Sequence, residues 1–357
     1  MITGFDVLTV RNSILISTIM HFILLKDIFN FTTQMRNKYG SCFRVWAGKR
    51  LAFVCSDPRY YEVVFNSSKN IAKNNMYDFL IPWLGEGLLL STGKKWFNRR
   101  KIITPTFHFK ILHQFVEVFN RINNVFVDKL MTMSDSHTPF NIYPDISLMT
   151  LDIISETAMG TKINAQLNEN ADYVNAVKEI SYIISSRFIK MWMRPEFIFN
   201  LLPEKQRHDK CIEIMHKFTT NIIEKHREAI MKEDKTDVSI EDIENDDTGL
   251  KRKQALLDVL LMSTIDGKPL TNAEITEEVD TFMFEGHDTT TSAISFTLYL
   301  LSQNSDVQEK ILEETRRVLG DDSLVAPTYN HLQEMKYLEA VIKESLRLYP
   351  PVPMFGR

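Results

Sequence analysis

One stretch of the chain restricts its fold more than any other, a long run without proline between residues 271 and 301. Thr271 followed three residues later by Glu274 is typical of a capping box at the start of a helix. The run contains a cluster of polar and ionisable side chains, from Glu285 to Ser292, among apolar ones. Because an unpaired carboxylate in a dry interior is costly or becomes protonated, such a cluster indicates a partner, a cofactor or trapped water. We therefore predict one long helix that carries a functional site.

The polar cluster lies on one face of this predicted helix. Glu285, Asp288, Thr289 and Ser292 have the spacing i, i+3, i+4 and i+7, which places them on the same side. An amphipathic helix with its polar stripe in water is the ordinary interpretation of such a pattern. Apolar residues around most of the circumference favour a buried helix instead. Gly286 in the middle of the helix indicates that something approaches its backbone closely.

A second candidate site is formed by Trp96 and Arg100. Their i, i+4 spacing on a helix allows an indole N–H and a guanidinium to face one anion together. A core tryptophan beside a surface arginine gives the same pattern, so the pair alone is a weak signal. Its position, well before the polar cluster of the long helix, adds weight to the anion-binding interpretation.

A third pattern joins Glu344 and Arg347 to a proline-rich segment. Glu-x-x-Arg on an exposed helix is common and contributes little stability. Here Pro350 and Pro351 end the helix, and Tyr349 before them is biased towards an extended conformation. The combination is more distinctive than the ion pair alone.

The composition fits a large helical protein with a small β region. Of the 357 residues, 44% are hydrophobic, which is enough for a substantial core, and the 12 glycines and 12 prolines are too few for an all-β chain of this length. A net charge of −4 argues against nucleic acid as the main partner. The 3 cysteines, an odd number without close spacing, point to a reducing compartment and no disulfide framework.

Short elements are also predicted at both ends of the chain. Residues 42–46 and 51–55 have the pattern of a β-hairpin, and Pro58 follows at the first turn of a helix. Ser305 with Gln308 predicts a second capping box, at the start of a helix that stops before a glycine.

The predicted organisation is one mainly α domain with a small β region over residues 26–357, preceded by an uncertain segment, residues 1–25. Residues 231–253 are crowded with aspartate and glutamate. Like charges at that density repel each other and stay solvated, so we predict an acidic surface loop there rather than a metal site.

The long helix resembles the central helix of the cytochrome P450 haem-thiolate monooxygenases, whose pattern there is small residue, Gly, any, acid, Thr, Thr. Gly286, Asp288, Thr289 and Thr290 match it. The resemblance implies a cytochrome P450-like helical fold, with Thr289 and Asp288 as the catalytic residues that deliver protons. Where most members have Ala or Gly before that glycine, this chain has Glu285. Glu-Gly-His-Asp-Thr-Thr is similar to the fatty-acid omega-hydroxylase branch, in which that glutamate can form an ester bond to a haem methyl group.

The other two patterns match the same family. It uses the Trp-x-x-x-Arg pair, here Trp96 and Arg100, to bind haem propionates. The Glu-x-x-Arg pair, here Glu344 and Arg347, locks the scaffold on the proximal side of the haem. Arg357 falls where many members place another propionate-binding arginine. The resemblance therefore implies haem iron as cofactor, NADPH-derived electrons through a reductase partner, and insertion of one oxygen atom from O2 into a lipophilic substrate such as a fatty acid.

One feature of the family has no counterpart here, the iron-ligating cysteine in a Phe-x-x-Gly loop after the Glu-x-x-Arg helix. Cys42 and Cys55 lie in strand-like segments and Cys211 in an amphipathic helical run, without the surroundings that stabilise a thiolate. The His287 ring points about half a turn away from the Glu285 face, so it is discounted as a ligand. We expect no axial metal ligand among these residues. The chain is then a partial product, inactive as it stands and without the thiolate-type absorption band in the presence of carbon monoxide.

The resemblance also implies attachment to the endoplasmic reticulum membrane on its cytoplasmic face, because eukaryotic members usually carry an amino-terminal anchor. The apolar run at residues 14–25 is shorter than the roughly 20 residues that a membrane-spanning helix needs. It also lacks the flanks of a secretory signal. We therefore expect contact with the membrane surface through apolar side chains, without an evident anchor.

Two other classes of function stay open. One is a helical lipid- or haem-binding protein without catalysis, which would be isolated with a bound ligand and show no turnover. The other is a metal-dependent enzyme acting on diphosphates, which would need aspartates clustered on facing helices. The adjacent pairs Asp246-Asp247 and Asp321-Asp322 both lie in loop-like sequence, which disfavours it.

Overall fold

The computed structural model describes most of the chain, namely residues 13–15, 25–47, 50–67, 70–134, 140–168, 170–233, 255–320 and 325–357. Helices dominate these residues, and the strands form one sheet of three and one of two. The predicted fold class, mainly α with a small β region, is confirmed.

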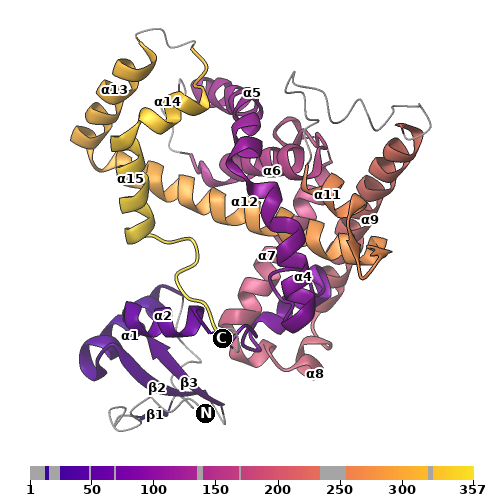
Figure 1. Ribbon diagram of the computed structural model, residues 1–357. Coiled ribbons are helices and arrows are strands. Elements are labelled where there is room, and N and C mark those ends of the chain that lie inside the picture. The colour runs from indigo at the N-terminus through magenta and orange to yellow at the C-terminus, as the bar shows by residue number, and fades with distance from the viewer. Residues whose placement is uncertain are drawn as a thin grey trace. The chain divides into compact units, whose positions relative to one another are not determined.

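The chain divides into two compact units, each described by itself (Figure 1). The first contains Met1–Phe79, Glu179–Asp209 and Arg357, and the second contains Leu80–Lys178 and Lys210–Gly356. The division runs through two helices rather than at a linker. The domain limits inferred from the sequence, a single domain over residues 26–357, stay a prediction.

The first unit contains the small sheet. Strands β2 (Cys42–Ala47) and β3 (Arg50–Cys55) pair antiparallel from Cys42 opposite Cys55 to Ala47 opposite Arg50, as the hairpin pattern predicted. Strand β1 (Ser13–Leu15) adds to β2 in parallel. Helix α2 (Pro58–Phe65) begins where Asp57 caps it by accepting the Arg59 backbone N–H at 3.0 Å.

The other elements that lie at least partly in the first unit are helices α1 (Leu25–Tyr39), α7 (Ala171–Ile189), α8 (Glu196–Phe199) and α9 (Pro203–Glu233), with 3-10 turns η3 (Tyr77–Leu80) and η6 (Met191–Met193). Helices α7 and α9 continue into the second unit.

The second unit is built around α12 (Asn272–Ser302), which packs along α6 (Tyr143–Met159), and α6 packs in turn on α5 (Phe109–Ser134) (Figure 1). A buried hydrophobic cluster joins the three helices. It consists of Val118, Ile122 and Phe126 of α5 and Ile146 and Met149 of α6, with Ile294 of α12 packed against them. Burial of this apolar surface is the main stabilising contribution to the contact between these helices.

Shorter elements surround this core. They are helices α3 (Ile81–Leu84), α4 (Gly93–Ile103), α11 (Leu256–Met262), α13 (Ser305–Leu319), α14 (Tyr329–Glu334) and α15 (Lys336–Leu348), 3-10 turns η4 (Thr104–Phe107) and η5 (Ala165–Leu167), and strands β4 (Thr264–Ile265) and β5 (Lys268–Pro269).

The cap predicted for α13 is wrong by one residue. Asn304, not Ser305, is the N-cap residue, and no side chain completes a capping box there. The Asn304 side chain instead donates back to the Leu300 carbonyl at 2.8 Å and closes the end of α12. The predicted stop of α13 before Gly320 is confirmed. Gly320 has a φ of +84°, which glycine adopts without strain.

Several predictions fall on residues that the structure does not describe. Most of the acidic segment 231–253, both aspartate pairs of the diphosphate alternative and most of the apolar run 14–25 lie outside the described residues. Among the helices that are described, none combines the length and the apolar character needed to span a bilayer.

Candidate functional site on helix α12

Helix α12 begins with the predicted capping box. Thr271 Oγ1 accepts the Glu274 backbone N–H at 3.3 Å, and Glu274 accepts the Thr271 backbone N–H at 2.9 Å. These bonds satisfy donors that would otherwise be unpaired at the start of the helix. With no proline after them, the helix continues through the whole polar cluster to Ser302.

One side of the polar cluster is buried against α6. His287 Nε2 lies 2.7 Å from Ser147 Oγ, and the hydroxyls of Thr150 and Thr291 are 2.7 Å apart. Burial lowers the pKa of His287 to about 4, so the imidazole is neutral at physiological pH. The motif histidine is therefore a packing residue between two helices, which agrees with its exclusion as a haem ligand.

The glycine of the motif is explained by the same contact. A Cβ atom on Gly286 would lie 2.6 Å from Ile154 Cδ1 of α6, which is closer than carbon atoms pack. Sequence reasoning expected a close approach to this backbone. The structure identifies the approaching group as Ile154, which makes Gly286 a requirement of helix packing.

The opposite side of α12 carries Glu285 and Thr289, and both are half-buried. The Thr289 hydroxyl donates to the Glu285 backbone carbonyl of the preceding turn, which leaves the hydroxyl oxygen able to accept a hydrogen bond. Phe296, two turns further along the same face, is 38% exposed. This face of the helix therefore presents an acid, a hydroxyl and an aromatic ring.

Asp288 has a partner that sequence reasoning missed. The Tyr143 hydroxyl, at the start of α6, donates to Asp288 Oδ1 at 3.2 Å and lies 3.4 Å from Ser292 Oγ. Burial raises the pKa of Tyr143, and the Asp288 charge raises it further, so the phenol stays protonated and can donate. Nothing in the sequence links two residues so far apart, and only the packing of α6 on α12 brings them together.

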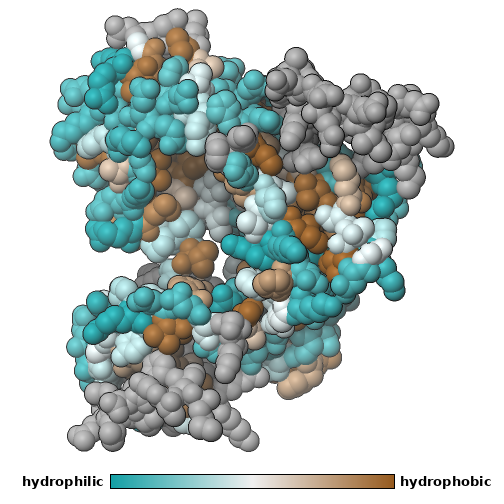
Figure 2. Space-filling view, viewed as in Figure 1, coloured by the Kyte–Doolittle hydropathy of each residue, from teal (hydrophilic) through white to brown (hydrophobic). Residues whose placement is uncertain are grey.

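Hydrophobic side chains are exposed over the carboxyl-terminal half of α12 and on α15. In the space-filling view, hydrophobic side chains are visible among hydrophilic ones in this part of the surface and elsewhere (Figure 2). On the two helices they are Phe296, Leu298 and Tyr299 of α12 and Ile342, Leu346 and Leu348 of α15. Tyr349 stacks on Phe296 with ring centroids 4.9 Å apart, which extends the apolar surface past the end of α15.

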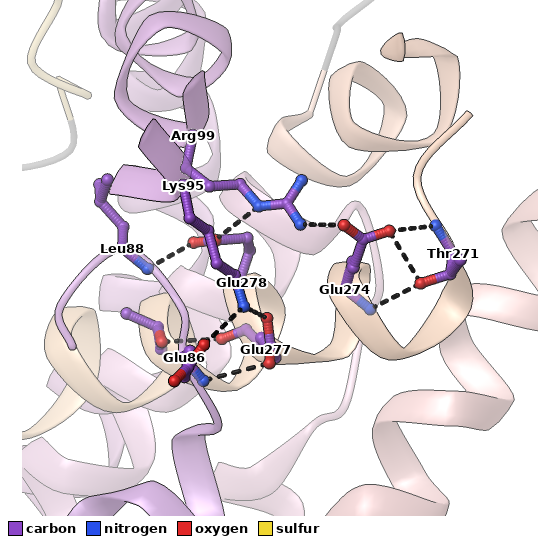
Figure 3. Close-up of polar contacts among 9 residues, drawn as sticks. Glu86, Leu88, Lys95, Arg99, Thr271, Glu274, Glu277 and Glu278 are labelled. Atoms are coloured by element: carbon purple, nitrogen blue, oxygen red, sulfur yellow. Dashed lines mark hydrogen bonds and ion pairs between the residues drawn. The ribbon is translucent and has the colours of Figure 1, made fainter. Parts of the chain in front are cut away.

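Helix α4 uses its two adjacent arginines in different ways. Arg99 is fully buried and forms ion pairs with Glu274 at 2.8 Å and with Glu278 at 3.3 Å, both on α12 (Figure 3). Arg100 is exposed and has no ion pair among the described residues. Trp96, one turn before Arg100, is half-buried, and its indole N–H makes no hydrogen bond to another described residue. Two donors on one face of α4 are therefore unused.

The contact of α4 with α12 extends into the preceding loop. The Leu88 backbone N–H donates to Glu278 at 2.9 Å, and the Glu86 backbone N–H donates to Glu277 at 3.1 Å (Figure 3). Lys95 of α4 adds an ion pair with Glu277 at 2.7 Å. Burial raises the pKa of Glu278 to about 7, although the Leu88 N–H and the Arg99 charge oppose the change. Sequence reasoning missed this network, whose members lie about 190 residues apart.

Comparison with known proteins identifies the family. A family model described as Cytochrome P450 matches residues 12–357. The chain belongs to the cytochrome P450 family. The resemblance inferred from Gly286, Asp288, Thr289 and Thr290 is thereby confirmed.

Curated relatives of this cytochrome P450 chain include three proteins of Drosophila melanogaster. Cytochrome P450 4d2 is 53% identical over 334 residues, which cover 93% of this chain and 66% of that protein. Cytochrome P450 4d8 is 51% identical over 322 residues, covering 90% and 69%, and cytochrome P450 4c3 is 43% identical over 337 residues, covering 93% and 63%. The chain thus spans about two thirds of the length of these relatives.

The remaining predicted site residues of this cytochrome P450 chain lie elsewhere. Glu344 and Arg347 of α15 form a two-point ion pair at 2.7 and 2.8 Å with more than half of each side chain exposed, and Arg347 lowers the pKa of Glu344. Arg357, in the first unit, donates to the Ile71 carbonyl at 2.9 Å. Their roles near a haem stay predictions.

The three cysteines do not resemble an iron ligand. Cys42 and Cys55 lie side by side with their sulfurs 3.1 Å apart, and Cys211 is buried in α9. Burial, followed by the neighbouring Cys42, raises the pKa of Cys55 to about 12, so Cys55 is a protonated thiol. Among the described residues no group of three or more His, Cys, Asp or Glu could hold a metal ion.

A small cavity of about 40 Å³ lies beside α5 and α6, where Arg121, Asp152 and Gln166 contribute to its lining. Its volume is far below that of a porphyrin site, and its lining contains none of the predicted site residues.

Proposed function

We propose that this chain forms part of a haem-dependent monooxygenase that inserts one oxygen atom from O2 into a lipophilic substrate such as a fatty acid. The proposal rests on membership of the cytochrome P450 family together with one observation on α12. Two of its motif residues, His287 and Gly286, pack on α6, whereas Glu285 and Thr289 are only partly covered.

The side chains on α4 fit the propionate groups of a haem. The indole N–H of Trp96 and the guanidinium of Arg100 lie one helical turn apart, and neither has a hydrogen-bond or ion-pair partner among the described residues. The adjacent Arg99, by contrast, forms ion pairs with two carboxylates. A pair of unused donors, one of them cationic, is the donor set that a carboxylate requires. We assign Trp96 and Arg100 as propionate ligands, and Arg357 as a further candidate.

Bound haem would supply the iron centre at which dioxygen is activated with electrons from a reductase. Residues of this chain would deliver the protons that the reaction needs. The Thr289 hydroxyl donates a hydrogen bond to the Glu285 backbone carbonyl. The hydroxyl oxygen of Thr289 can therefore accept a hydrogen bond from a water molecule and hold it in place. Asp288 would supply the proton, held in place by the Tyr143 hydroxyl at 3.2 Å.

Glu285 is the residue that favours a fatty-acid substrate. It is half-buried on the same face as Thr289, one turn away. In line with the omega-hydroxylase resemblance, we propose that its carboxylate forms an ester with a haem methyl carbon. In this two-electron oxidation the carboxyl group loses its proton, the methyl group loses one hydrogen, and O2 with electrons from the reductase would serve as the oxidant and be reduced to water. Denaturation of the haem-loaded protein in acidified organic solvent should then leave haem attached to the peptide that contains Glu285, and Glu285→Ala should release it.

The membrane and partner assignments also follow from the resemblance. We propose a location on the cytoplasmic face of the endoplasmic reticulum membrane and a reductase that delivers electrons from NADPH. The apolar side chains exposed on α12 and α15 are compatible with a lipophilic environment near the site.

We assign none of the three cysteines of this chain as the thiolate ligand of a haem iron. Cys42 and Cys55 contact each other, and Cys211 is buried inside α9, so none of the three has the basic surroundings that stabilise a thiolate.

The experiment that tests this function uses a haem-loaded protein in which these residues are combined with a cysteine thiolate ligand, incubated with a reductase, NADPH, a fatty acid and isotopically labelled O2. We expect one labelled oxygen in a hydroxylated product. Thr289→Ala should lower turnover by about 100-fold or more, because a positioned proton-transfer group typically contributes about 10²- to 10⁴-fold, while Thr289→Ser, which keeps the hydroxyl, should retain most of the turnover. Unlabelled product, or equal loss in both variants, would refute the proposal.

A further inference from the structure

The hairpin of the first unit places two cysteines directly opposite each other. Cys42 at the start of β2 pairs with Cys55 at the end of β3. The next pair outward is joined by a hydrogen bond from the Ser56 N–H to the Ser41 carbonyl at 2.8 Å. Because hydrogen-bonded and non-hydrogen-bonded pairs alternate in an antiparallel ladder, Cys42 and Cys55 occupy a non-hydrogen-bonded pair, the kind whose side chains lie closest.

The two thiols are already in contact. Their sulfur atoms are 3.1 Å apart, both residues are half-buried, and neither is engaged in a disulfide. A disulfide has a sulfur–sulfur bond of about 2.05 Å, and its Cα atoms lie within the spacing of directly opposed strand residues. Bond formation therefore requires an approach of about one ångström and no change of register.

We propose that Cys42 and Cys55 form an oxidisable dithiol that a peroxide converts to a cross-strand disulfide. This is a modification site separate from the haem chemistry, and it does not depend on the function proposed above. The pair has only two sulfur ligands, and the described residues contain no third His, Cys, Asp or Glu that would complete a metal site with them. Reversible oxidation is the chemistry that two adjacent thiols support.

The reaction balances without any group from the site on α12. Hydrogen peroxide oxidises one thiol to a sulfenic acid and leaves as water. The second thiol attacks the sulfenic sulfur, forms the sulfur–sulfur bond and releases a second water. In total, two thiols and one peroxide give one disulfide and two waters, and two electrons pass from the sulfurs to the peroxide.

The surroundings predict a slow reaction. Burial and the neighbouring Cys42 raise the pKa of Cys55 to about 12, which keeps that sulfur protonated. Thiolates are the reactive species, so Cys55 reacts slowly with peroxide.

Oxidation would stiffen the hairpin and the segments bonded to it. The Tyr61 hydroxyl of α2 donates to the Cys55 carbonyl at 2.7 Å, and Arg36 of α1 donates to the Ser56 hydroxyl at 3.0 Å. A covalent link between the strands would hold both helices to the end of the sheet that carries the two cysteines.

Peptide mapping of the full 357-residue chain tests the proposal. The reduced protein is treated with hydrogen peroxide, its remaining thiols are alkylated, and tryptic peptides are separated without reductant. Trypsin cuts between the two cysteines and places them in Tyr39–Arg44 and Leu51–Arg59. We expect these two peptides to appear joined after oxidation and separate after reduction, with Cys211 alkylated throughout as the internal control.

Variants distinguish this disulfide from general oxidation. Cys211→Ser should leave the joined peptide unchanged, whereas Cys42→Ser and Cys55→Ser should each abolish it. Peptide mapping of the unaltered chain shows by itself whether Cys42 and Cys55 become joined, so a variant that fails to fold does not weaken the test. Recovery of Cys42 and Cys55 as separate sulfinic or sulfonic acids, or linkage of either to Cys211, would overturn the proposal.

Discussion

The backbone of Gly286 in α12 lies so close to Ile154 of α6 that a Cβ atom on the glycine would come within 2.6 Å of the isoleucine Cδ1. The motif glycine thus sets how closely the two helices approach. Through that approach it also fixes the position of Asp288, whose hydrogen-bond donor Tyr143 belongs to α6.

We expect Gly286→Ala to destabilise the protein, although alanine is the better helix former. Overpacking typically costs about 1–3 kcal/mol, and the gain in helix propensity of roughly 1 kcal/mol offsets only part of it. Urea denaturation measures the change. The control is Gly286→Ala combined with Ile154→Ala, which removes the colliding atoms and should be more stable than the sum of the two single effects predicts. Strict additivity would show that the contact is not the cause.

We expect the buried Arg99 of α4 to contribute far more to the free energy of unfolding than the adjacent, exposed Arg100. Replacing Arg99 by methionine leaves the Glu278 carboxylate buried without its cation, which should cost about 3–5 kcal/mol in the free energy of unfolding. Arg100→Met, at an exposed position without an ion pair among the described residues, should change it by less than about 0.5 kcal/mol. Equal effects in the two variants would contradict the assignment of Arg99 as the anchor.

The buried ionisable groups Glu278, Asp280 and His287 of α12 should give pH dependences of stability with two opposite signs. Burial lowers the pKa of His287 from 6.5 to about 4, so the unfolded chain binds its proton first and stability is lost as pH falls from about 6.5 to 4. Burial raises the pKa of Glu278 from 4.5 to about 7, so stability is lost as pH rises from about 4.5 to 7. Burial also raises the pKa of Asp280 from 3.8 to about 6, which adds a loss of stability with rising pH of the same sign as that of Glu278.

Variants should separate the two slopes. With Glu278→Gln and Asp280→Asn combined, the free energy of unfolding should rise with pH between about 4 and 6.5, because of these three groups only His287 still contributes. With His287→Gln it should fall with pH between about 4.5 and 7. Urea denaturation at a series of pH values measures both, and a variant whose slope has the other sign would disprove the corresponding pKa shift.

The absorption spectrum should reveal the absence of a thiolate ligand. Loaded with haem, reduced and exposed to carbon monoxide, the 357-residue chain should lack the thiolate-type band, because Cys42 and Cys55 contact each other and Cys211 is buried in α9. Cys42→Ser and Cys211→Ser should leave the spectrum unchanged. If the band appears and one of these variants removes it, that cysteine is a ligand and the assignment is wrong.

Local features were predictable from the sequence. The capping box at Thr271, the hairpin of residues 42–55 and the family motif around Gly286 each depend on residues close together in the chain, and each was confirmed. The start of α13 was misplaced by one residue because Asn304 turns back to the preceding helix, a choice that the sequence pattern does not reveal.

Contacts between distant segments were not predictable. Tyr143 beside Asp288 and Arg99 beside Glu278 depend on how α6 and α4 pack on α12. The Cys42–Cys55 contact was missed for a different reason. Both strands were foreseen, but a shift of one residue in their register would separate the two thiols, and the strand pattern alone does not determine the register.

Whether a haem binds between the proposed residues of α4 and α12 is tested by titrating the 357-residue chain with haem and monitoring the absorption spectrum. The chain should bind, and Arg100→Ala should raise the dissociation constant about tenfold, the equivalent of about 1.4 kcal/mol for one lost charge-assisted contact. The matched control Lys101→Ala, at the adjacent exposed position of α4, should leave it within about twofold. No binding by the unaltered chain, or equal affinity in the Arg100 and Lys101 variants, would contradict the proposed haem site.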